Sequence, residues 1–382
     1  MHGWLDTKLT VDWRPLAGLH DIVEPWRALA ARAIEPNAFY EPAFALAAAA
    51  AFGPDAHALL VWAPKPARRL AGFFPARIGR RFGMGPRLLA GWIHPFAMLG
   101  TPLVDRDHSD AVIATWLDRV GGEPAWPDVA LLPTCSAEGP FAAALERVLA
   151  SRGLPHADFG LHRRALLSPG SERKRYLARS IGARHRKELP RKRRRLAELG
   201  AVSHEVTTVE EDIRNALECF FELEARGWKG RRGTAATQCD KRLRFFRTAV
   251  TGLARDGKAR IDLLRVGERV IATTIALRSG DSMFGWKMAY DEAFAKYSPG
   301  AQLILNLTED ALADPALARI DSCAEANHPL IDHLWRDRFT VSDRLLALRG
   351  DRRAAFQAAC LVEKTRRKAI RGAKAVRDRL RG

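Results

Sequence analysis

The chain has 382 residues, which is enough for two domains of roughly 100–200 residues each. Its composition, 47% hydrophobic and 28% charged, is that of a globular protein and argues against disorder. No apolar run reaches the roughly 18 residues of a membrane helix, and the start lacks the pattern of a secretory signal. The five cysteines are scattered without CxxC spacing, so we expect no metal site, no disulfide framework and a reduced, cytoplasmic protein.

The net charge of +18 is concentrated in two segments of the chain. Residues 172–198 hold 12 Lys and Arg against 3 Glu, and residues 352–382 hold 11 against 2 acidic residues. Each segment would suit a polyanion, such as nucleic acid, an acidic membrane surface or a phosphorylated ligand. The alternative is a solvated helical face in an arginine-rich protein.

The first half of the chain alternates helical and strand-like patterns. An Ala-rich helix follows the turn at Glu41-Pro42, and a strand hairpin with Lys65-Pro66 in its turn comes next. The predicted elements after that helix are strands at 59–62, 70–78 and 88–93, a helix over 109–120, a strand at 129–132 and a helix over 140–152.

The second half repeats this order of elements. It opens with a basic helical stretch over 172–199 that ends at Gly200. Two amphipathic helices then precede three strands joined by the turns 266–268 and 279–281. The predicted elements are a strand at 202–206, helices over 213–223 and 240–255, strands at 259–265, 269–278 and 282–290, a helix over 299–312 and a strand at 319–323.

The order helix, antiparallel meander, helix, strand therefore occurs twice, which predicts an α+β fold with two tandem domains. In each domain the last strand should return parallel to the end of the meander, through a right-handed crossover. We place the N-terminal domain at 1–168, the C-terminal domain at 169–350 and a basic tail at 351–382. The tail has few apolar residues, which favours a partly helical arm that extends from the fold, although a docked helix remains the alternative.

The segment around Ser298-Pro299-Gly300 carries the strongest local signal. Ser298 is a good helix N-cap, and Pro299 suits the first helical position. The N–H groups of Gly300, Ala301 and Gln302 would lack intrahelical partners, so this helix start would bind a pyrophosphate. The alternative is an ordinary capped helix after a loop.

With this segment the chain resembles the GNAT acyltransferase superfamily in its tandem, FemAB-like form. More closely, it resembles the acetyltransferase family associated with bacterial cellulose biosynthesis. The resemblance covers roughly residues 20–345, and the segments that carry it are 39–44, 100–104, 184–200, 223–230, the meander, 289–292, 297–303 and 320–321.

The resemblance implies a donor acyl-CoA between the last meander strand and the strand that carries Asp321. Ser298, Gly300, Ala301 and Gln302 would then bind its phosphates. The sequence departs from the family here, because the phosphate loop of the family usually begins with Arg or Gln and has two spaced glycines. This chain has Lys296, Pro299 and a single glycine instead.

Acyl transfer to an amine needs a base for the attacking ammonium and a donor for the leaving thiolate. The residues after the last strand include His328, whose ordinary pKa suits the base. Asp321 would orient His328, and Tyr290 would protonate the thiolate. The alternative for His328-Pro329 is a plain turn.

Arg226, Trp228 and Lys229 end an apolar helix, where they would bind an acceptor sugar or peptide. Trp228 is equally a candidate core residue. We therefore predict an acyl-CoA-dependent N- or O-acyltransferase for a sugar, amino sugar or envelope precursor. The alternatives are an aminoacyl-tRNA-dependent transferase, as in FemAB-like enzymes, and a non-catalytic protein that binds nucleic acid or an anionic membrane. The basic tail would bring the enzyme to the inner membrane.

Overall fold

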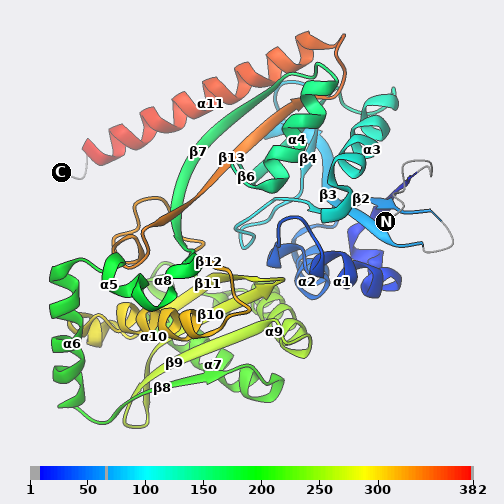
Figure 1. Ribbon diagram of the computed structural model, residues 1–382. Coiled ribbons are helices and arrows are strands. Elements are labelled where there is room, and N and C mark those ends of the chain that lie inside the picture. Colours follow the sequence, from blue (N-terminus) through cyan, green and yellow to red (C-terminus); the bar gives the residue numbers. More distant parts are fainter. Residues whose placement is uncertain (1–8, 65–67, 380–382) are drawn as a thin grey trace. The chain divides into compact units, whose positions relative to one another are not determined.

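The computed structural model describes residues 9–64 and 68–379 (Figure 1), so the predicted turn at Lys65-Pro66 lies outside the described residues. The chain divides into two compact units. Unit 1 comprises residues 1–39, 53–162 and 340–382, and unit 2 comprises residues 40–52 and 163–339. This division differs from the expected boundaries 1–168, 169–350 and 351–382 in three segments. Residues 40–52 and 163–168 belong to unit 2, and residues 340–382 return to unit 1.

Unit 1 contains strands in the order β1-β2-β3-β4-β6-β13, with β5 beside β3. Their bounds are β1 (Thr10–Pro15), β2 (His57–Trp62), β3 (Leu70–Arg80), β4 (Arg87–Gly91), β5 (Leu103–Val104), β6 (Val129–Ser136) and β13 (Asp337–Ala347). Its helices are α1 (Val23–Ala31), α3 (Ser109–Gly122), α4 (Pro140–Ser151) and α11 (Arg353–Arg379). The core lies between α3, α4 and the sheet, where Phe74 stacks on Trp116.

Unit 2 contains residues 163–167 of β7 and then the strands β12-β11-β10-β9-β8, in this order. Their bounds are β7 (His156–Leu167), β8 (Val202–Thr207), β9 (Ala259–Val266), β10 (Arg269–Ser279), β11 (Ser282–Tyr290) and β12 (Arg319–Asp321). Its helices are α2 (Pro42–Phe52), α5 (Tyr176–Ser180), α6 (Ala183–Ala197), α7 (Glu210–Arg226), α8 (Trp228–Arg231), α9 (Asp240–Arg255) and α10 (Pro299–Ala313). Within this unit α7, α9 and α10 pack on the meander strands.

Both predicted meanders are confirmed, because β2-β3-β4 and β9-β10-β11 are antiparallel throughout. Both predicted crossovers are confirmed too, since β6 pairs parallel with β4 and β12 pairs parallel with β11. The α+β fold with two similar units therefore holds. Strands β1, β7 and β13 were not predicted, because their sequences are mixed rather than regularly alternating.

Helix α2 shows why residues 40–52 belong to unit 2. Five of its seven alanines are buried. Phe44 contacts Phe245 and Trp286 edge to face, with ring centroids 5.3 and 5.4 Å away. The buried Glu41 just before α2 accepts hydrogen bonds from Lys258 (2.7 Å) and Ser279 (2.6 Å). An apolar helix and a paired buried charge thus join this segment to α9, β10, β11 and the residue that precedes β9.

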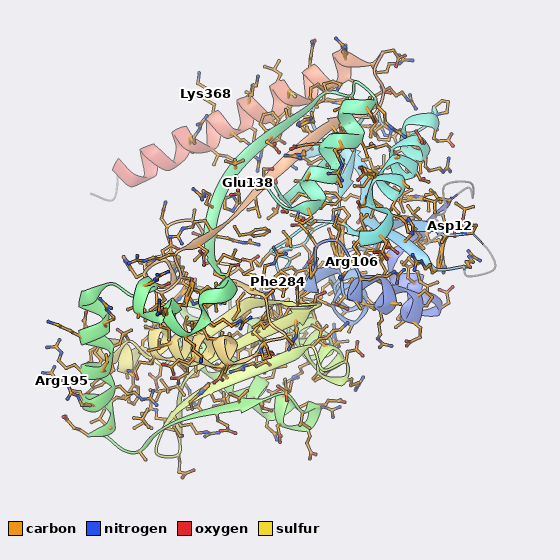
Figure 2. All side chains as sticks on the ribbon, viewed as in Figure 1. Asp12, Arg106, Glu138, Arg195, Phe284 and Lys368 are labelled. Carbon is orange, nitrogen blue, oxygen red and sulfur yellow. The ribbon has the colours of Figure 1, made fainter. Side chains whose placement is uncertain are left out.

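The basic stretch over 172–199 is not one helix, contrary to the prediction. A short 3-10 helix and α5 end at Ser180, and α6 begins after Gly182. Leu189 and Leu196 of α6 are buried, whereas most of its arginines are exposed, as Figure 2 shows for Arg195. The segment therefore has one packed face and one strongly basic face.

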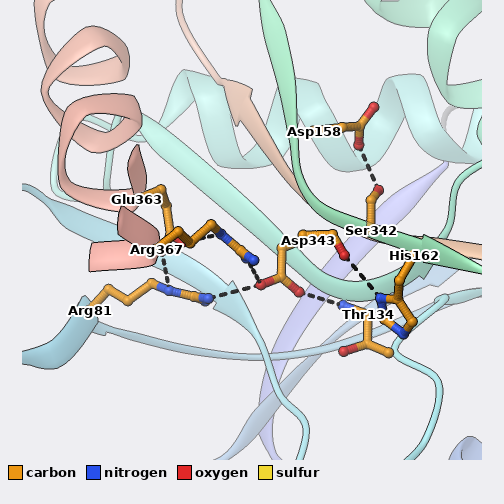
Figure 3. A network of polar contacts seen from close by, with 9 residues as sticks. Arg81, Thr134, Asp158, His162, Ser342, Asp343, Glu363 and Arg367 are labelled. Atoms are coloured by element: carbon orange, nitrogen blue, oxygen red, sulfur yellow. Dashed lines mark hydrogen bonds and ion pairs between the residues drawn. The ribbon is translucent and has the colours of Figure 1, made fainter. Parts of the chain in front are cut away.

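The basic tail forms α11, and its first half packs on unit 1 rather than extending from the fold as expected. Ala359 is buried against Leu131 and Leu345, in a cluster to which Phe356 also adds. The buried Glu363 bonds to Arg81 and Arg367, and both arginines bond to Asp343 (Figure 3), at 3.0 and 2.6 Å. Apolar contacts and this ion network hold the first half, while Lys368 and Ile370 are exposed (Lys368 in Figure 2).

No helix in the described part of the chain has the length and apolar composition that a membrane-spanning helix needs.

Candidate functional site

The candidate site lies in unit 2, where β11 and β12 separate. These strands pair only over Ser282–Phe284 and Arg319–Asp321, after which β12 ends and β11 continues to Tyr290. The register of β11 against β10 skips Trp286, which makes a β-bulge at this point. A cavity of about 270 Å³ occupies the gap, and its walls include Ile304 of α10 and Trp335.

Helix α10 begins beside this cavity, at the predicted phosphate-binding segment. Ser298 occupies the N-cap position with φ 54°, in the left-handed region that is rare outside glycine, and its side chain does not cap the helix. The N–H groups of Ala301 and Gln302 both donate to the Ser298 carbonyl, at 3.1 and 3.2 Å. The prediction that three N–H groups lack intrahelical partners is therefore wrong for Ala301 and Gln302. Of the three, only the Gly300 N–H takes no part in the hydrogen bonds of this first turn.

Two basic side chains of α6 reach the start of α10. Lys192 Nζ donates to Ser298 Oγ over 2.9 Å and is also 2.9 Å from Glu188 Oε1. Arg193 donates to Gln302 Oε1 at 3.5 Å. The start of a helix already carries partial positive charge, so two further cations make this corner attractive to an anion. The sequence did not identify these residues, because nothing in a run of arginines tells which ones face α10.

Gly300 is buried against the cavity wall. A Cβ atom at this position would lie 2.9 Å from Met288 Sδ and 3.8 Å from Leu330 Cδ1, and both side chains line the cavity. The absence of a side chain therefore allows α10 to begin close to β11.

His328 lines the same cavity, but the geometry changes its expected role. Its Nδ1 accepts from the backbone N–H groups of Leu330 (3.3 Å) and Ile331 (3.4 Å). With Nδ1 as the acceptor, the proton of the neutral ring is on Nε2. His328 is thus arranged as a hydrogen-bond donor rather than as the expected base.

Asp321 is buried, and its described contacts do not include His328. Its carboxylate accepts from Arg164 over 2.5 Å and from the Cys323 N–H over 2.9 Å. Arg164 is buried as well, so the two residues form an internal ion pair at the end of β12. Asp321 therefore shapes the loop that carries Cys323, which is itself held at φ 52°.

Tyr290 and Trp228 lie together in a shallow pocket that shares Lys229 and Met288 with the cavity. Tyr290 is 39% exposed and Trp228 is 49% exposed, which excludes Trp228 as a core residue. Arg232 stacks over the Trp228 ring at 5.1 Å, whereas Arg226 pairs with Glu222. Two exposed aromatic side chains beside the cavity are better placed to bind an acceptor than to fill a hydrophobic core.

Lys287 is the ionisable residue of the cavity that the sequence did not single out. Burial and the charge of Lys229 lower the pKa of the Lys287 ammonium to about 8. Lys229 itself is paired with Glu224, over 2.6 Å. Burial raises the pKa of the Cys323 thiol well above its ordinary value, which keeps this cysteine uncharged.

One described cluster, His204, Asp262 and Asp310, has the spacing of a metal site. The guanidinium of Arg260 bonds to both carboxylates, over 2.6 Å in the case of Asp262. A protein cation thus already neutralises these acids.

The corresponding strand gap in unit 1 differs from the cavity of unit 2. Gly100 N–H donates to Thr134 O over 2.9 Å, so the chain after β4 folds against the end of β6. On the side of α3 only about 10 Å³ remains. A groove of about 600 Å³ lies along the same two strands, with Gly91, Ile93 and Thr134 in its walls. In unit 2, by contrast, the cavity adjoins the helix that follows the meander, because Ile304 of α10 lines it.

The model of the acetyltransferase (GNAT) domain family matches residues 183–328, which include α6, the meander, α10 and the loop to His328. No curated protein sequence matches the chain.

Solved structures resemble the fold at low identity. FemX covers 86% of this chain and 96% of its own, with a TM-score of 0.56 and 9% identity. The match to a protein of unknown function from Bacteroides thetaiotaomicron covers 89% of this chain and 100% of that protein, with a TM-score of 0.54 and 9% identity. A third match is the C-terminal DUF2156 domain of a protein from Agrobacterium fabrum that is named as a lysylphosphatidylglycerol synthetase. It covers 90% of this chain and 95% of that domain, with a TM-score of 0.52 and 12% identity. The fold is thus shared with FemX, and residues 183–328 match the acetyltransferase (GNAT) domain, which makes this chain an acyltransferase.

Proposed function

We propose that this chain transfers an acyl group from acyl-CoA, most simply acetyl-CoA, to a nitrogen or oxygen of its acceptor. The observation that carries the proposal is the open cavity between β11 and β12, which adjoins the start of α10. An acyl-thioester would enter this gap, and its phosphates would meet the helix start. The 270 Å³ volume suits the acyl and thiol end of the donor, not the whole molecule.

The donor phosphates would bind at Ser298, Gly300, Ala301 and Gln302. The contacts would be the Ser298 hydroxyl and the Gly300 N–H, because the N–H groups of Ala301 and Gln302 already donate to the Ser298 carbonyl. Lys192 and Arg193 would add positive charge to this loop, whose sequence departs from the pattern of the family, because both side chains reach the helix start. Phosphate attracts such cations and oriented N–H groups together.

In the transfer step, His328 would donate from Nε2 to the thioester oxygen or the leaving thiolate. Asp321 would act through the loop that it holds, and Tyr290 would protonate the thiolate from the edge of the acceptor pocket. Trp228 would stack on the acceptor, with Arg226 and Lys229 beside it.

The acceptor we propose is a small molecule or glycan precursor: a sugar, an amino sugar or an envelope precursor in polysaccharide biosynthesis. The support is the exposed Trp228–Tyr290 pair, since aromatic faces bind sugar rings. We place the reaction in the cytoplasm, with contact to the inner membrane through the exposed half of α11.

A second candidate donor is aminoacyl-tRNA, for which the basic face of α6 is the supporting observation. The exposed basic residues of this helix are Arg186, Lys187, Arg191, Arg194 and Arg195. A nucleic acid would neutralise such a row and release counterions, so its binding would weaken steeply with salt.

Calorimetry with CoA tests the proposal and separates the two donors. The acyl-CoA donor requires saturable binding of CoA at 150 mM salt, and acetyl-CoA should raise the melting temperature by mass action. Binding of tRNA but not of CoA would replace the donor with the second candidate. Binding of neither would refute both.

A further inference from the structure

The cavity between β11 and β12 is lined by four ionisable side chains. For three of them, hydrogen bonds or burial indicate which form the side chain takes. Lys229 Nζ donates to Glu224 Oε1 over 2.6 Å and is therefore an ammonium. His328 accepts at Nδ1, and Cys323 is an uncharged thiol. The fourth is Lys287.

Lys287 follows the bulge at Trp286, on the part of β11 that no longer pairs with β12. Burial removes water from its ammonium, and the nearby charge of Lys229 disfavours a second cation. The charge of Glu224 acts in the opposite sense but more weakly, so the pKa falls from 10.5 to about 8. With this pKa, about a tenth of the Lys287 side chains are neutral amines at pH 7, and the neutral amine is the nucleophilic form of lysine.

We propose that Lys287 is an acyl acceptor within its own site, and that the chain acylates it when no other acceptor is bound. Nζ attacks the thioester carbonyl, the C–N bond forms and the C–S bond breaks. The proton that the amine loses passes to the leaving thiolate, so the products are an amide on Lys287 and free CoA thiol. The inference rests on the acyl-CoA donor proposed above.

The amide would be stable and would stop the enzyme. It adds an acyl group to a cavity of about 270 Å³ and removes an amine from its wall. Because a bound acceptor would compete for the same thioester, self-acylation would be greatest when acceptor is scarce.

The test incubates the purified full-length chain with acetyl-CoA and, in parallel, with the acetyl thioester of N-acetylcysteamine, which lacks the phosphates. Peptide mass spectrometry then measures acetylation at each lysine between pH 6.5 and 10. Acetylation of Lys287 should rise about tenfold from pH 7 to pH 9 and then level off, as a pKa of about 8 requires. Lys241, which is exposed on α9, should keep rising through this range.

Two controls are internal to the cavity. Lys229 lines it as an ion-paired ammonium and should stay unmodified at pH 7.5. Lys229→Met removes the neighbouring charge, so it should raise the pKa of Lys287 and slow its acetylation at pH 7.5 but not at pH 10. Lys287→Met should remove the labelled peptide while leaving the melting temperature within a few degrees.

The outcomes separate this inference from the proposed function. Acetylation of Lys287 by both thioesters, at a lower concentration of acetyl-CoA, supports both proposals. Acetylation by the small thioester alone leaves Lys287 as the reactive amine and removes CoA as the donor. If CoA binds but neither thioester modifies Lys287 more than Lys241, the inference is overturned and the proposed function stands.

Discussion

Lys192 of α6 donates a hydrogen bond to Ser298 Oγ, over 2.9 Å, at the residue where α10 begins. This brings a cation to the positive end of a helix dipole, an arrangement that is unfavourable unless an acid or a bound anion compensates. Glu188 neutralises one charge, whereas the described bond of Arg193 runs to the neutral Gln302. The corner therefore retains a positive potential that a phosphate group would neutralise.

Lys192→Ala should weaken the binding of CoA about fivefold or more, which corresponds to about 1 kcal/mol for one charge-assisted contact. Calorimetry at 50 and 300 mM salt is the measurement, and the loss should shrink at high salt. Arg195→Ala is the matched control, because it removes an exposed charge from the same helix (Figure 2). Equal losses for both variants would mean that only the general charge of α6 matters.

Gly300→Ala should weaken CoA binding about tenfold with little loss of stability. The new Cβ would lie 2.9 Å from Met288 Sδ, so this flexible side chain must move into the cavity. A larger residue such as Glu would have no space in this buried position and would damage the fold itself. Gly372→Ala, where a Cβ meets nothing within 4 Å, is the control. Unchanged affinity in the folded Gly300→Ala variant would argue against a donor in this cavity.

The sequence predicted the meanders and crossovers because alternation, turn residues and helical spacing are local signals. It did not predict that β13 and α11 return to unit 1 or that α2 joins unit 2, since such pairings depend on contacts between distant segments. The same limit applies to the site. Gly300 was found from its turn, whereas Lys287 lies in an ordinary strand pattern, and only burial beside Lys229 changes its pKa. His328 lines the cavity, but which of its ring nitrogens is hydrogen-bonded follows from the fold alone.

Glu41→Ala should lower the free energy of unfolding by about 3–5 kcal/mol, because it leaves Lys258 with no partner for its charge in a largely buried position. Glu41→Gln combined with Lys258→Met should cost less, since it removes both charges. Burial raises the pKa of the Glu41 carboxyl above its ordinary value. The folded state therefore binds this proton more tightly than the unfolded state, and the resulting stability falls as the pH rises from the ordinary carboxyl pKa through the raised one. Urea unfolding at pH 5 and pH 8 measures both effects. A double variant as unstable as Glu41→Ala would show that the ion pair is not the cause.

Two truncations distinguish the halves of α11. Ending the chain at Asp351 exposes the apolar cluster around Leu131 and Leu345 and removes Glu363 and Arg367 from their network with Arg81 (Figure 3). A loss of about 2–4 kcal/mol should lower the melting temperature by roughly 5–15 °C. Ending the chain after Arg371 keeps these contacts and should leave the melting temperature almost unchanged.

The second truncation also tests the contact with a membrane. The removed residues 372–382 carry four Lys and Arg against one Asp, and each basic residue near an anionic lipid surface contributes about 1 kcal/mol. We therefore expect the chain that ends after Arg371 to lose most of its binding to anionic vesicles, while neutral phosphatidylcholine vesicles bind neither form. Cosedimentation at low and high salt is the measurement. If the full chain does not bind anionic vesicles, α11 is only a structural helix of unit 1. If the shortened chain binds them as well as the full chain does, the membrane contact lies elsewhere. The basic face of α6 would then be the next surface to test by charge-removing substitutions.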